Sequence, residues 1–234
     1  MNNTKPCLSP IKIIIQKNNQ EISLRQLLAE NKCIVQGDQV IAFQITVPAD
    51  ITCALADDLV GACAQDIKII LQQNSVVKYT LRHPGFVSGS TCQKNLTFIF
   101  AGQHAQAFIN GLYHGKADKK LKLNITQDHQ ASHTSSACLI KSVLEDLSSL
   151  KCACLIKVGK ECAGVVAEQK SKTLMLGQNV RAVVIPQLEI ESYDSQCRHG
   201  ATMSSISEQD IFYLQSRGLD QIKAKQLLLD AFLK

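Results

Sequence analysis

Apolar and polar residues alternate with a period of two along most of the chain, which is the pattern of half-buried β-strands. In IKIIIQ at 11–16 and KCACLIKV at 151–158, every second position holds an aliphatic residue or a cysteine. Glycine, asparagine, aspartate and serine separate such runs, as turns require. The pattern therefore predicts a mainly β protein with strands at 11–16, 41–47, 67–72, 76–81, 96–101, 107–113, 120–126, 136–143, 151–158, 173–176 and 181–190.

Helical patterns are confined to two places. LRQLLAEN at 24–31 predicts one short helix. Near the C-terminus, SISE at 205–208 fits a capping box, so a helix is expected over 207–217, ending before Gly218. Asp220 is placed to cap a second helix. The apolar positions of that second helix would form one face, which must meet the β body or another protein: Ile222, Ala224, Leu227, Leu228, Ala231 and Phe232.

Many short strands fit a sandwich, a barrel or a solenoid of stacked rungs. The pair Asn110-Gly111 could form a hairpin turn, which favours an antiparallel fold. Several strands are apolar with few polar residues and the gaps between them vary in length, which favours a parallel solenoid. Since no fixed repeat length is visible, the pattern alone leaves solenoid and sandwich open.

Composition and charge narrow the class of protein. A chain of 234 residues suits one domain, or one domain with an appendage. The net charge of +5 is spread along the chain without interleaved aromatic residues, so nucleic-acid binding is not expected. The sequence has neither a secretory signal nor an apolar run of membrane-spanning length, which predicts a cytoplasmic protein without membrane contact.

The chain has ten cysteines, and cytoplasmic thiols stay reduced, so a disulfide framework is not expected. No CxxC…CxxC spacing is present, which argues against a structural zinc site. Most of these cysteines lie in apolar surroundings and are expected to pack as small buried hydrophobes: Cys53, Cys63, Cys138 and Cys162.

The C-terminal stretch carries a family resemblance. HGATMSSISEQDIFYLQSRGLDQIKAKQLLLDAF at 199–232, preceded by Cys197, resembles the C-terminal signature of the SufB/SufD family of iron–sulfur cluster assembly proteins. That signature has a C-x-H-G-A-T element, a helix with F-Y-L-x-S-R-G and an alanine- and leucine-rich helix ending in A-F. LMLGQNVRAVVIPQLEI at 174–190 is similar to the stretch that precedes it. Gly200 and Leu214 stand where SufB-like members have an acidic residue and a cysteine, so the likeness leans to the SufD side.

The resemblance implies a right-handed parallel β-helix over 1–203 and a C-terminal helical segment over 204–234, and so decides between the open architectures. It also implies a short form of a non-enzymatic scaffold that pairs with a SufB-like subunit and docks the SufC ATPase on its helices; a homodimer is a further expectation. The residues expected to bind partners are Phe212, Tyr213, Leu214, Arg217, Gly218, Leu228 and Phe232.

Cys197 and His199 are the candidate metal ligands. In an extended segment these two residues share a face, and thiolate and imidazole are both ligands of iron. Two ligands are too few for a permanent site, so we expect a transient iron or iron–sulfur cluster at an interface shared with the SufB-like partner, and no stable cofactor. Three alternatives stay open: a structural pair, a Cys/His nucleophilic pair in a β-solenoid enzyme, and a module that binds SufC without metal.

Other cysteines and histidines carry weaker expectations. Cys152 and Cys154 share a strand face but are expected to pack inside a rung. His129 and His133 lie in a polar segment that predicts a solvated loop rather than a metal site. No role is assigned to His83, His104 and His114.

Overall fold

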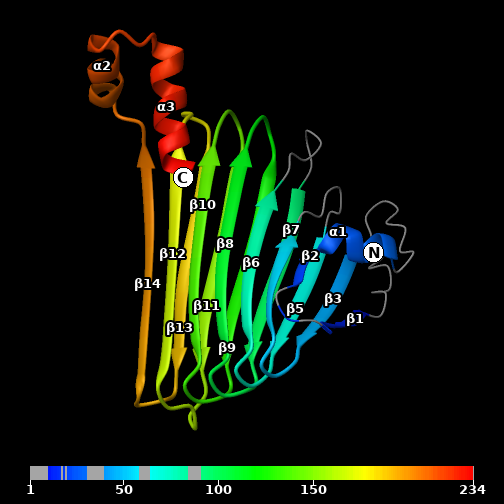
Figure 1. The fold of residues 1–234 in the computed structure, drawn as a ribbon. Helices are drawn as coiled ribbons and strands as arrows, with labels where there is room; N and C mark the ends of the chain where they lie inside the picture. The colour runs from blue at the N-terminus through cyan, green and yellow to red at the C-terminus, as the bar shows by residue number, and fades with distance from the viewer. Residues whose placement is uncertain are drawn as a thin grey trace, which may run out of the picture.

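The fold is a parallel β-solenoid, seen in a computed structural model that describes residues 10–16, 18, 20–30, 40–57, 64–83 and 91–233. Its strands form two seven-stranded parallel sheets, and consecutive strands alternate between them (Figure 1). One sheet has the order β1-β3-β5-β7-β9-β11-β13, and the other has the order β14-β12-β10-β8-β6-β4-β2. Two consecutive strands thus make one rung. The predicted parallel β-helix with short C-terminal helices is confirmed.

The strands of the structure can be compared with the strands predicted from the hydrophobic pattern. Each predicted run overlaps a strand, whereas β2, β4, β14 and the first part of β12 were missed. The elements are β1 Ile11–Ile14, β2 Gln20–Ser23, α1 Leu24–Glu30, β3 Val40–Val47, β4 Thr52–Asp57, β5 Ala64–Leu71, β6 Val76–His83, β7 Thr91–Phe100, β8 Gln106–Gly115, β9 Lys120–His129, β10 Ser135–Leu144, β11 Ser149–Val158, β12 Val165–Met175, β13 Arg181–Ile190, β14 Ser195–Ser205, α2 Glu208–Ser216 and α3 Gln221–Leu233.

Stacking of like positions builds the core and sets the period of two. In β9, buried residues alternate with outward ones, and Leu121 lies in register between Cys92 and Leu150 of the neighbouring rungs. Each buried aliphatic side chain of this kind contributes about 1.5–3 kcal/mol. The register repeats after 29 residues from Lys120 to Ser149 but after 32 from Ser149 to Arg181. Because the turns absorb this difference, the sequence shows no fixed period.

The turns at one edge of the solenoid repeat a left-handed residue in successive rungs. The N–H of such a residue donates to a carbonyl of the next rung, as from His133 to Ala163 at 2.7 Å. The His104 and His133 rings stack with their centroids 5.2 Å apart. At Gly164 a Cβ would lie 2.5 Å from Nδ1 of His133, so only glycine fits. The repeated positions are Asp50 (φ 59°), Asn74 (54°), His104 (59°), His133 (59°) and Gly164 (63°).

The predicted hairpin turn at Asn110-Gly111 is wrong. Both residues lie inside β8, and every strand pair in the described part of the chain is parallel. Gly111 instead occupies an inward position, where an added Cβ would lie 2.6 Å from Cδ1 of Ile140. This glycine therefore makes room for a side chain of the next rung rather than for a turn.

Two helices follow the last strand and are here called the helical tail (α2 and α3). The predicted capping box of Ser205 and Glu208 is wrong, because β14 continues to Ser205. Ser207 is the N-cap instead, and its hydroxyl oxygen accepts the N–H of Asp210 at 3.0 Å. In the described part of the chain, no helix has the length and apolar character needed to cross a membrane.

A buried charged pair lies in the N-terminal half of the solenoid. Nζ of Lys94 lies 2.6 Å from Oδ2 of Asp57, and both side chains are almost fully buried. The hydroxyl of Tyr79 donates to the same oxygen at 2.6 Å. Inside an apolar core each charge is tolerated only because the other compensates it.

We expect Asp57→Ala to lower the free energy of unfolding by about 3–5 kcal/mol, since it leaves the Lys94 cation buried and unpaired. The double variant Asp57→Ala/Lys94→Met removes both charges and should recover most of that loss. Urea denaturation of the two variants and the wild type checks this. A cost below about 1 kcal/mol for the single change would contradict a dry, paired site.

Candidate functional site

The last rung, β13 with β14, is open on one side and is here called the open end. Among the described residues β13 pairs only with β11 and β14 only with β12, at the left of Figure 1. Leu188 and Ile190 are in register with Ile156 and Val158, which are fully buried, yet they are 37% and 40% exposed. The open end therefore presents an interior-like surface to solvent.

Cys197 and His199 lie on this open end. Their partners in register on β12 are Ala167 and Gln169, which are both buried, so both ligand candidates occupy inward positions of β14. Cys197 is half-buried against the apolar cluster that includes Val165, whereas His199 is exposed. The structure thus places the thiol and the imidazole on one face, with the imidazole accessible to another molecule.

The environment of Cys197 keeps its thiol protonated in the isolated chain. Burial raises the pKa of this thiol, and hydrogen bonding to the Ser195 side chain and the Ala167 backbone offsets part of the rise. No group of three or more metal-ligating side chains occurs in the described part of the chain. Cys197 and His199 can therefore supply at most part of a coordination shell.

Gln169 is a polar residue of this region to which the sequence analysis gave no role. Its side chain is fully buried, and neither its amide oxygen nor its amide nitrogen has a hydrogen-bond partner in the described structure. A buried polar group left unpaired costs about 1–3 kcal/mol. The sequence feature that could have identified Gln169 is a polar residue at an inward position of VVAEQK. In the structure this position is in register with His199.

The helical tail is anchored through one side of α3. Leu229 is buried in a cluster with Val143 and Leu174, and Phe232 packs against the same cluster. Ile222 and Leu227, which the sequence placed on an apolar face that meets either the β body or another protein, are 82% and 49% exposed and so do not meet the body. The body thus covers only part of the predicted face, including Phe232, together with Leu229, which the prediction did not include.

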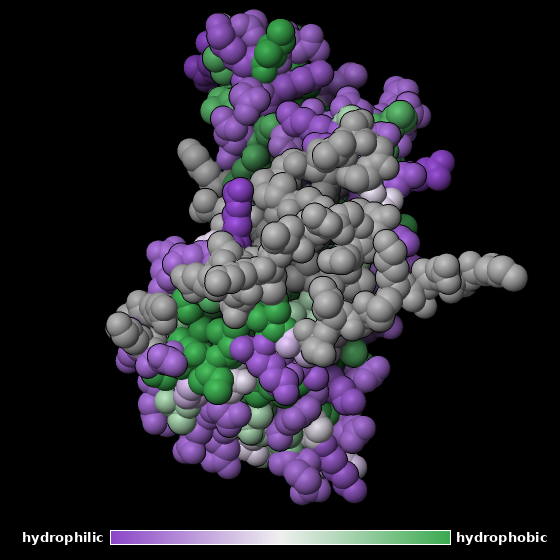
Figure 2. All heavy atoms as spheres, turned by 90° about the vertical axis from the view of Figure 1, so that its right-hand side faces the viewer, coloured by the Kyte–Doolittle hydropathy of each residue, from purple (hydrophilic) through white to green (hydrophobic). Residues whose placement is uncertain are grey.

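The other predicted partner-binding residues of the tail lie mainly on its surface. Phe212 is 73% exposed and Tyr213 is 57% exposed, and the guanidinium of Arg217 lies 5.5 Å from the Tyr213 ring centroid. Leu214 and Leu228 are half-buried. Gly218 has φ 90° and ends α2, as predicted. In Figure 2, seen from the N-terminal side, apolar patches interrupt the otherwise hydrophilic surface of the tail at the top.

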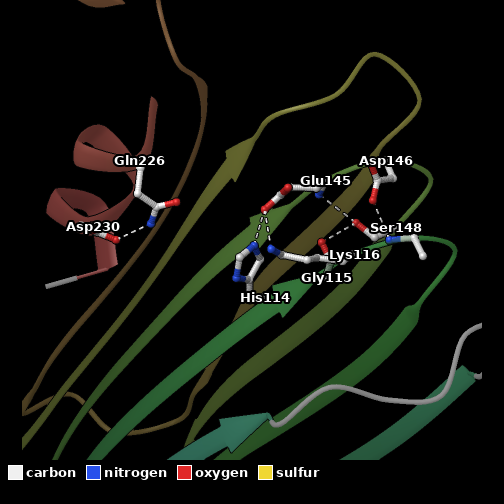
Figure 3. Close-up of polar contacts among 9 residues, drawn as sticks. His114, Gly115, Lys116, Glu145, Asp146, Ser148, Gln226 and Asp230 are labelled. Atoms are coloured by element: carbon white, nitrogen blue, oxygen red, sulfur yellow. Dashed lines mark hydrogen bonds and ion pairs between the residues drawn. The ribbon is translucent and has the colours of Figure 1, made fainter. Parts of the chain in front are cut away.

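A cleft of about 740 Å³ lies between the tail and the ends of the strands beneath it. Its lining includes Lys116 and Glu145, and Figure 3 shows His114 and Lys116 both directed at the Glu145 carboxylate. His114 contacts the carboxylate through Nε2, and Nζ of Lys116 lies 3.7 Å from it. Glu145 thus lies between an imidazole and an ammonium group, and within the described residues it belongs to no group of three or more metal-ligating side chains.

The other cysteines and histidines discussed from the sequence pack in the core, lie in turns, or fall outside the described residues. Cys53, Cys138 and Cys162 are buried free thiols, as predicted. Cys63 lies outside the described residues, as does the side chain of His83. His133 is exposed in a turn as expected, but His129 ends β9 and is fully buried, so the solvated-loop prediction is wrong for it.

Fold and site together define a parallel β-solenoid that ends in an open rung and an anchored helical tail. Residues 61–232 match the family model described as SUF system FeS cluster assembly, SufBD core domain. The chain belongs to this SufBD family. The predicted membership of the SufB/SufD family, on its SufD side, is therefore confirmed.

Individual relatives agree with the family model. The chain is 27% identical over 150 residues to the iron–sulfur cluster assembly protein SufD of Escherichia coli, an alignment that covers 64% of this chain and 36% of SufD. It is 29% identical over 116 residues to a SufBD family protein of Synechocystis, covering 50% of this chain and 25% of the relative. With one of Mycobacterium leprae it is 27% identical over 185 residues, covering 76% and 46%. The chain thus spans less than half the length of these relatives.

His129 should make the fold sensitive to mild acid. Burial lowers the pKa of His129 to about 4, while Nδ1 and Nε2 contact the hydroxyls of Thr134 and Ser136. In the unfolded chain the pKa of histidine is about 6.5. Between these values the unfolded state binds the extra proton, so the free energy of unfolding should fall as the pH drops from 6.5 towards 4, by up to about 1.4 kcal/mol per pH unit.

Urea denaturation at pH 7 and pH 5 measures this loss, which should be smaller in His129→Asn. His104→Asn is the matched control, because His104 is exposed and asparagine tolerates its φ of 59°. An unchanged pH dependence in His129→Asn would show that other groups titrate.

Proposed function

We propose that this chain is a SufD-like, non-catalytic scaffold subunit of a cytoplasmic SUF iron–sulfur cluster assembly complex. In this proposal the open end pairs with a SufB-like subunit, and the helical tail docks the SufC ATPase. Cys197 and His199 then supply ligands to a cluster or iron ion that is assembled at the interface as cargo. The observation that carries the proposal is the position of these two residues on the uncovered last rung of a SufBD family chain.

Unpaired strand edges support the pairing step. The outer backbone groups of β14 have no strand beside them in the described structure, and such an edge is a template for a strand of another chain. Large apolar side chains lie along the same rung, including Ile185 (38% exposed) and Met203 (46% exposed). A partner that covers them gains hydrophobic burial in addition to backbone hydrogen bonds.

Incomplete coordination supports the ligand step. His199 is exposed and Cys197 half-buried beside it, so both can be reached from the partner side of the rung. Iron binding requires a thiolate, and with the pKa of Cys197 raised, binding must release the proton of the thiol. A partner would then complete the shell with its own ligands. Gln169, in register with His199, can satisfy its amide through the same interface.

Surface-exposed apolar residues support the docking step. Phe212 and Ile222 are the most exposed large apolar side chains of the tail, at 73% and 82%. Such side chains are normally covered when they belong to an interface. The anchoring residues of α3 hold the tail against the body, so these two remain available to the ATPase.

The enzyme alternative receives less support from the same geometry. A nucleophilic cysteine needs a lowered pKa and an adjacent base, whereas burial raises the pKa of Cys197. The thiol is hydrogen-bonded to Ser195 and to the backbone of Ala167. A scaffold, unlike an enzyme with a cysteine nucleophile, does not require a reactive thiolate in the isolated chain.

The cluster-ligand role predicts that Cys197→Ala and His199→Ala each lower the iron and sulfide carried by the complex reconstituted with SufB-like subunit and SufC without oxygen. The double variant should fall little below the worse single one, because residues that serve one site are not additive. Cys162→Ala, a buried thiol of the same apolar cluster, is the control. Wild-type loading in the double variant would leave only a module that binds partners without metal.

The docking role predicts that Phe212→Asp and Ile222→Asp each weaken binding to SufC by at least about tenfold, since a carboxylate must be desolvated at an apolar contact. Calorimetric titration of the purified chain with SufC measures the affinity. Ile14→Asp is the control, because Ile14 is 65% exposed on β1 at the other end of the solenoid. Equal affinities for all three variants would place the ATPase elsewhere, and Phe232→Asp should in addition lower stability because Phe232 packs on the body.

A further inference from the structure

Gln169 is a buried residue whose amide has no use within the described chain. Its side chain is 0% exposed, and neither the amide oxygen nor the amide nitrogen has a hydrogen-bond partner in the described structure. Buried polar groups in native proteins are nearly always hydrogen-bonded, because an unpaired one destabilises the fold. A glutamine kept in such a position therefore points to a partner that the isolated chain does not supply.

The strand register places Gln169 next to His199. Both residues occupy inward positions on the adjacent parallel strands β12 and β14, and paired positions on such strands are about 4.8 Å apart. On its other side Gln169 is in register with Cys138, a buried thiol, which is only a weak hydrogen-bonding group. Ser171, the next inward residue of β12, is roughly 7 Å away along the strand. The imidazole of His199 is thus the strong hydrogen-bonding group nearest to the amide by register.

The column that contains Gln169 becomes polar only at the open end. In register, Ile109 of β8 and Cys138 of β10 come before it, and both are buried, whereas Gln169 and His199 form the last two positions. An amide can accept a hydrogen bond there without placing a charge in the core, as a carboxylate would. The change from apolar to polar residues thus coincides with the rung on which His199 lies.

Covering the open end changes what the ring of His199 can bond. In the described chain His199 is exposed, so water satisfies its ring nitrogens. Once another chain covers β14, that water leaves, and a ring N–H without an acceptor would be costly. Turning the ring towards Gln169 gives this N–H an acceptor and gives the buried amide oxygen its missing partner.

We propose that Gln169 is a positioning residue for His199: its amide oxygen accepts the inward ring N–H of His199 when a partner chain covers the open end. This bond fixes which ring nitrogen carries the proton, so the other nitrogen is unprotonated and faces the covering chain. Histidines that bind metals are commonly held in this way by an oxygen acceptor behind the ring. The role rests on the proposed function, which supplies the covering partner and the iron, and it adds the residue that orients the imidazole.

The hydrogen bond is observable by NMR as a ring N–H of His199 that is protected from exchange with water. The chain, labelled with ¹⁵N in its histidine rings, is measured alone and in an iron-free complex with a deuterated SufB-like subunit, after size-exclusion chromatography has verified the complex. In the isolated chain this N–H should exchange too fast to be detected. In the complex one ring N–H signal should appear, and its loss in His199→Asn assigns it.

Gln169→Met separates positioning from packing, because methionine keeps the length of the side chain and removes its polar atoms. Since the amide is unpaired in the isolated chain, this variant should melt at or above the wild-type temperature, whereas loss of a packing residue would lower it. Its complex should lack the His199 signal and bind iron about 10–100-fold more weakly. Gln127→Met is the matched control and should keep both, because the Gln127 amide is equally buried and unpaired but is in register with Phe98 and Ile156.

The possible outcomes distinguish this role from the proposed function. A complex that forms without the ring N–H signal would overturn the role of Gln169 alone, and so would a signal that persists in Gln169→Met or disappears in Gln127→Met. Failure of the two chains to form a complex would reject the proposed pairing and this role with it. A signal that depends on Gln169, in a complex that binds no iron, would support the positioning role and reject the ligand role of His199.

Discussion

Hydrogen bonding between stacked parallel strands is the interaction on which the rest of this structure depends. Each rung satisfies the backbone groups of the rung before it, and the interior side chains stack in the same register. Such a ladder has no natural end, so its last member must leave one edge unpaired. The consequence here is that β14 carries Cys197 and His199 on an edge with interior-like neighbours.

The open end exposes Cys197 and His199 on an uncovered rung, and no group of three or more metal-ligating side chains occurs there among the described residues. Cys197 packs against the apolar cluster behind it, and His199 occupies an inward position that is exposed because no further rung covers it. Gln169, in register with His199, has a buried amide without a hydrogen-bond partner in the described structure. The helical tail adds a second, separate surface, held to the strand ends through Leu229. In the proposed scaffold function, a partner covers each of these two surfaces.

The sequence predicted the outward–inward alternation well, because side-chain burial in a stacked rung follows strand parity directly. It failed where inward positions are polar: the start of β12 places Gln169 and Ser171 inside, so this segment lacks the alternation of a half-buried strand and was not predicted as one. Asn110-Gly111 was misread because the small size of Gly111 serves packing against Ile140 rather than a turn. The hydrophobic pattern could not decide between a sandwich and a solenoid. The direction of strand pairing depends on contacts between residues about 29 positions apart, such as Lys120 and Ser149, and a local pattern does not report such contacts. The C-x-H-G-A-T signature, a family resemblance rather than a physical pattern, identified the candidate ligands.

Hydrogen–deuterium exchange at β14 tests most directly whether the last rung is completed by another chain. The backbone amides of Ser195–Ser205 should exchange fast in the isolated chain wherever they face the free edge, and should become strongly protected when a SufB-like subunit is added. Amides of β9, which pairs with β7 and β11 on its two sides, should be slow in both samples. Unchanged exchange in β14 after the partner has bound would contradict the account, because the partner would then cover some other surface.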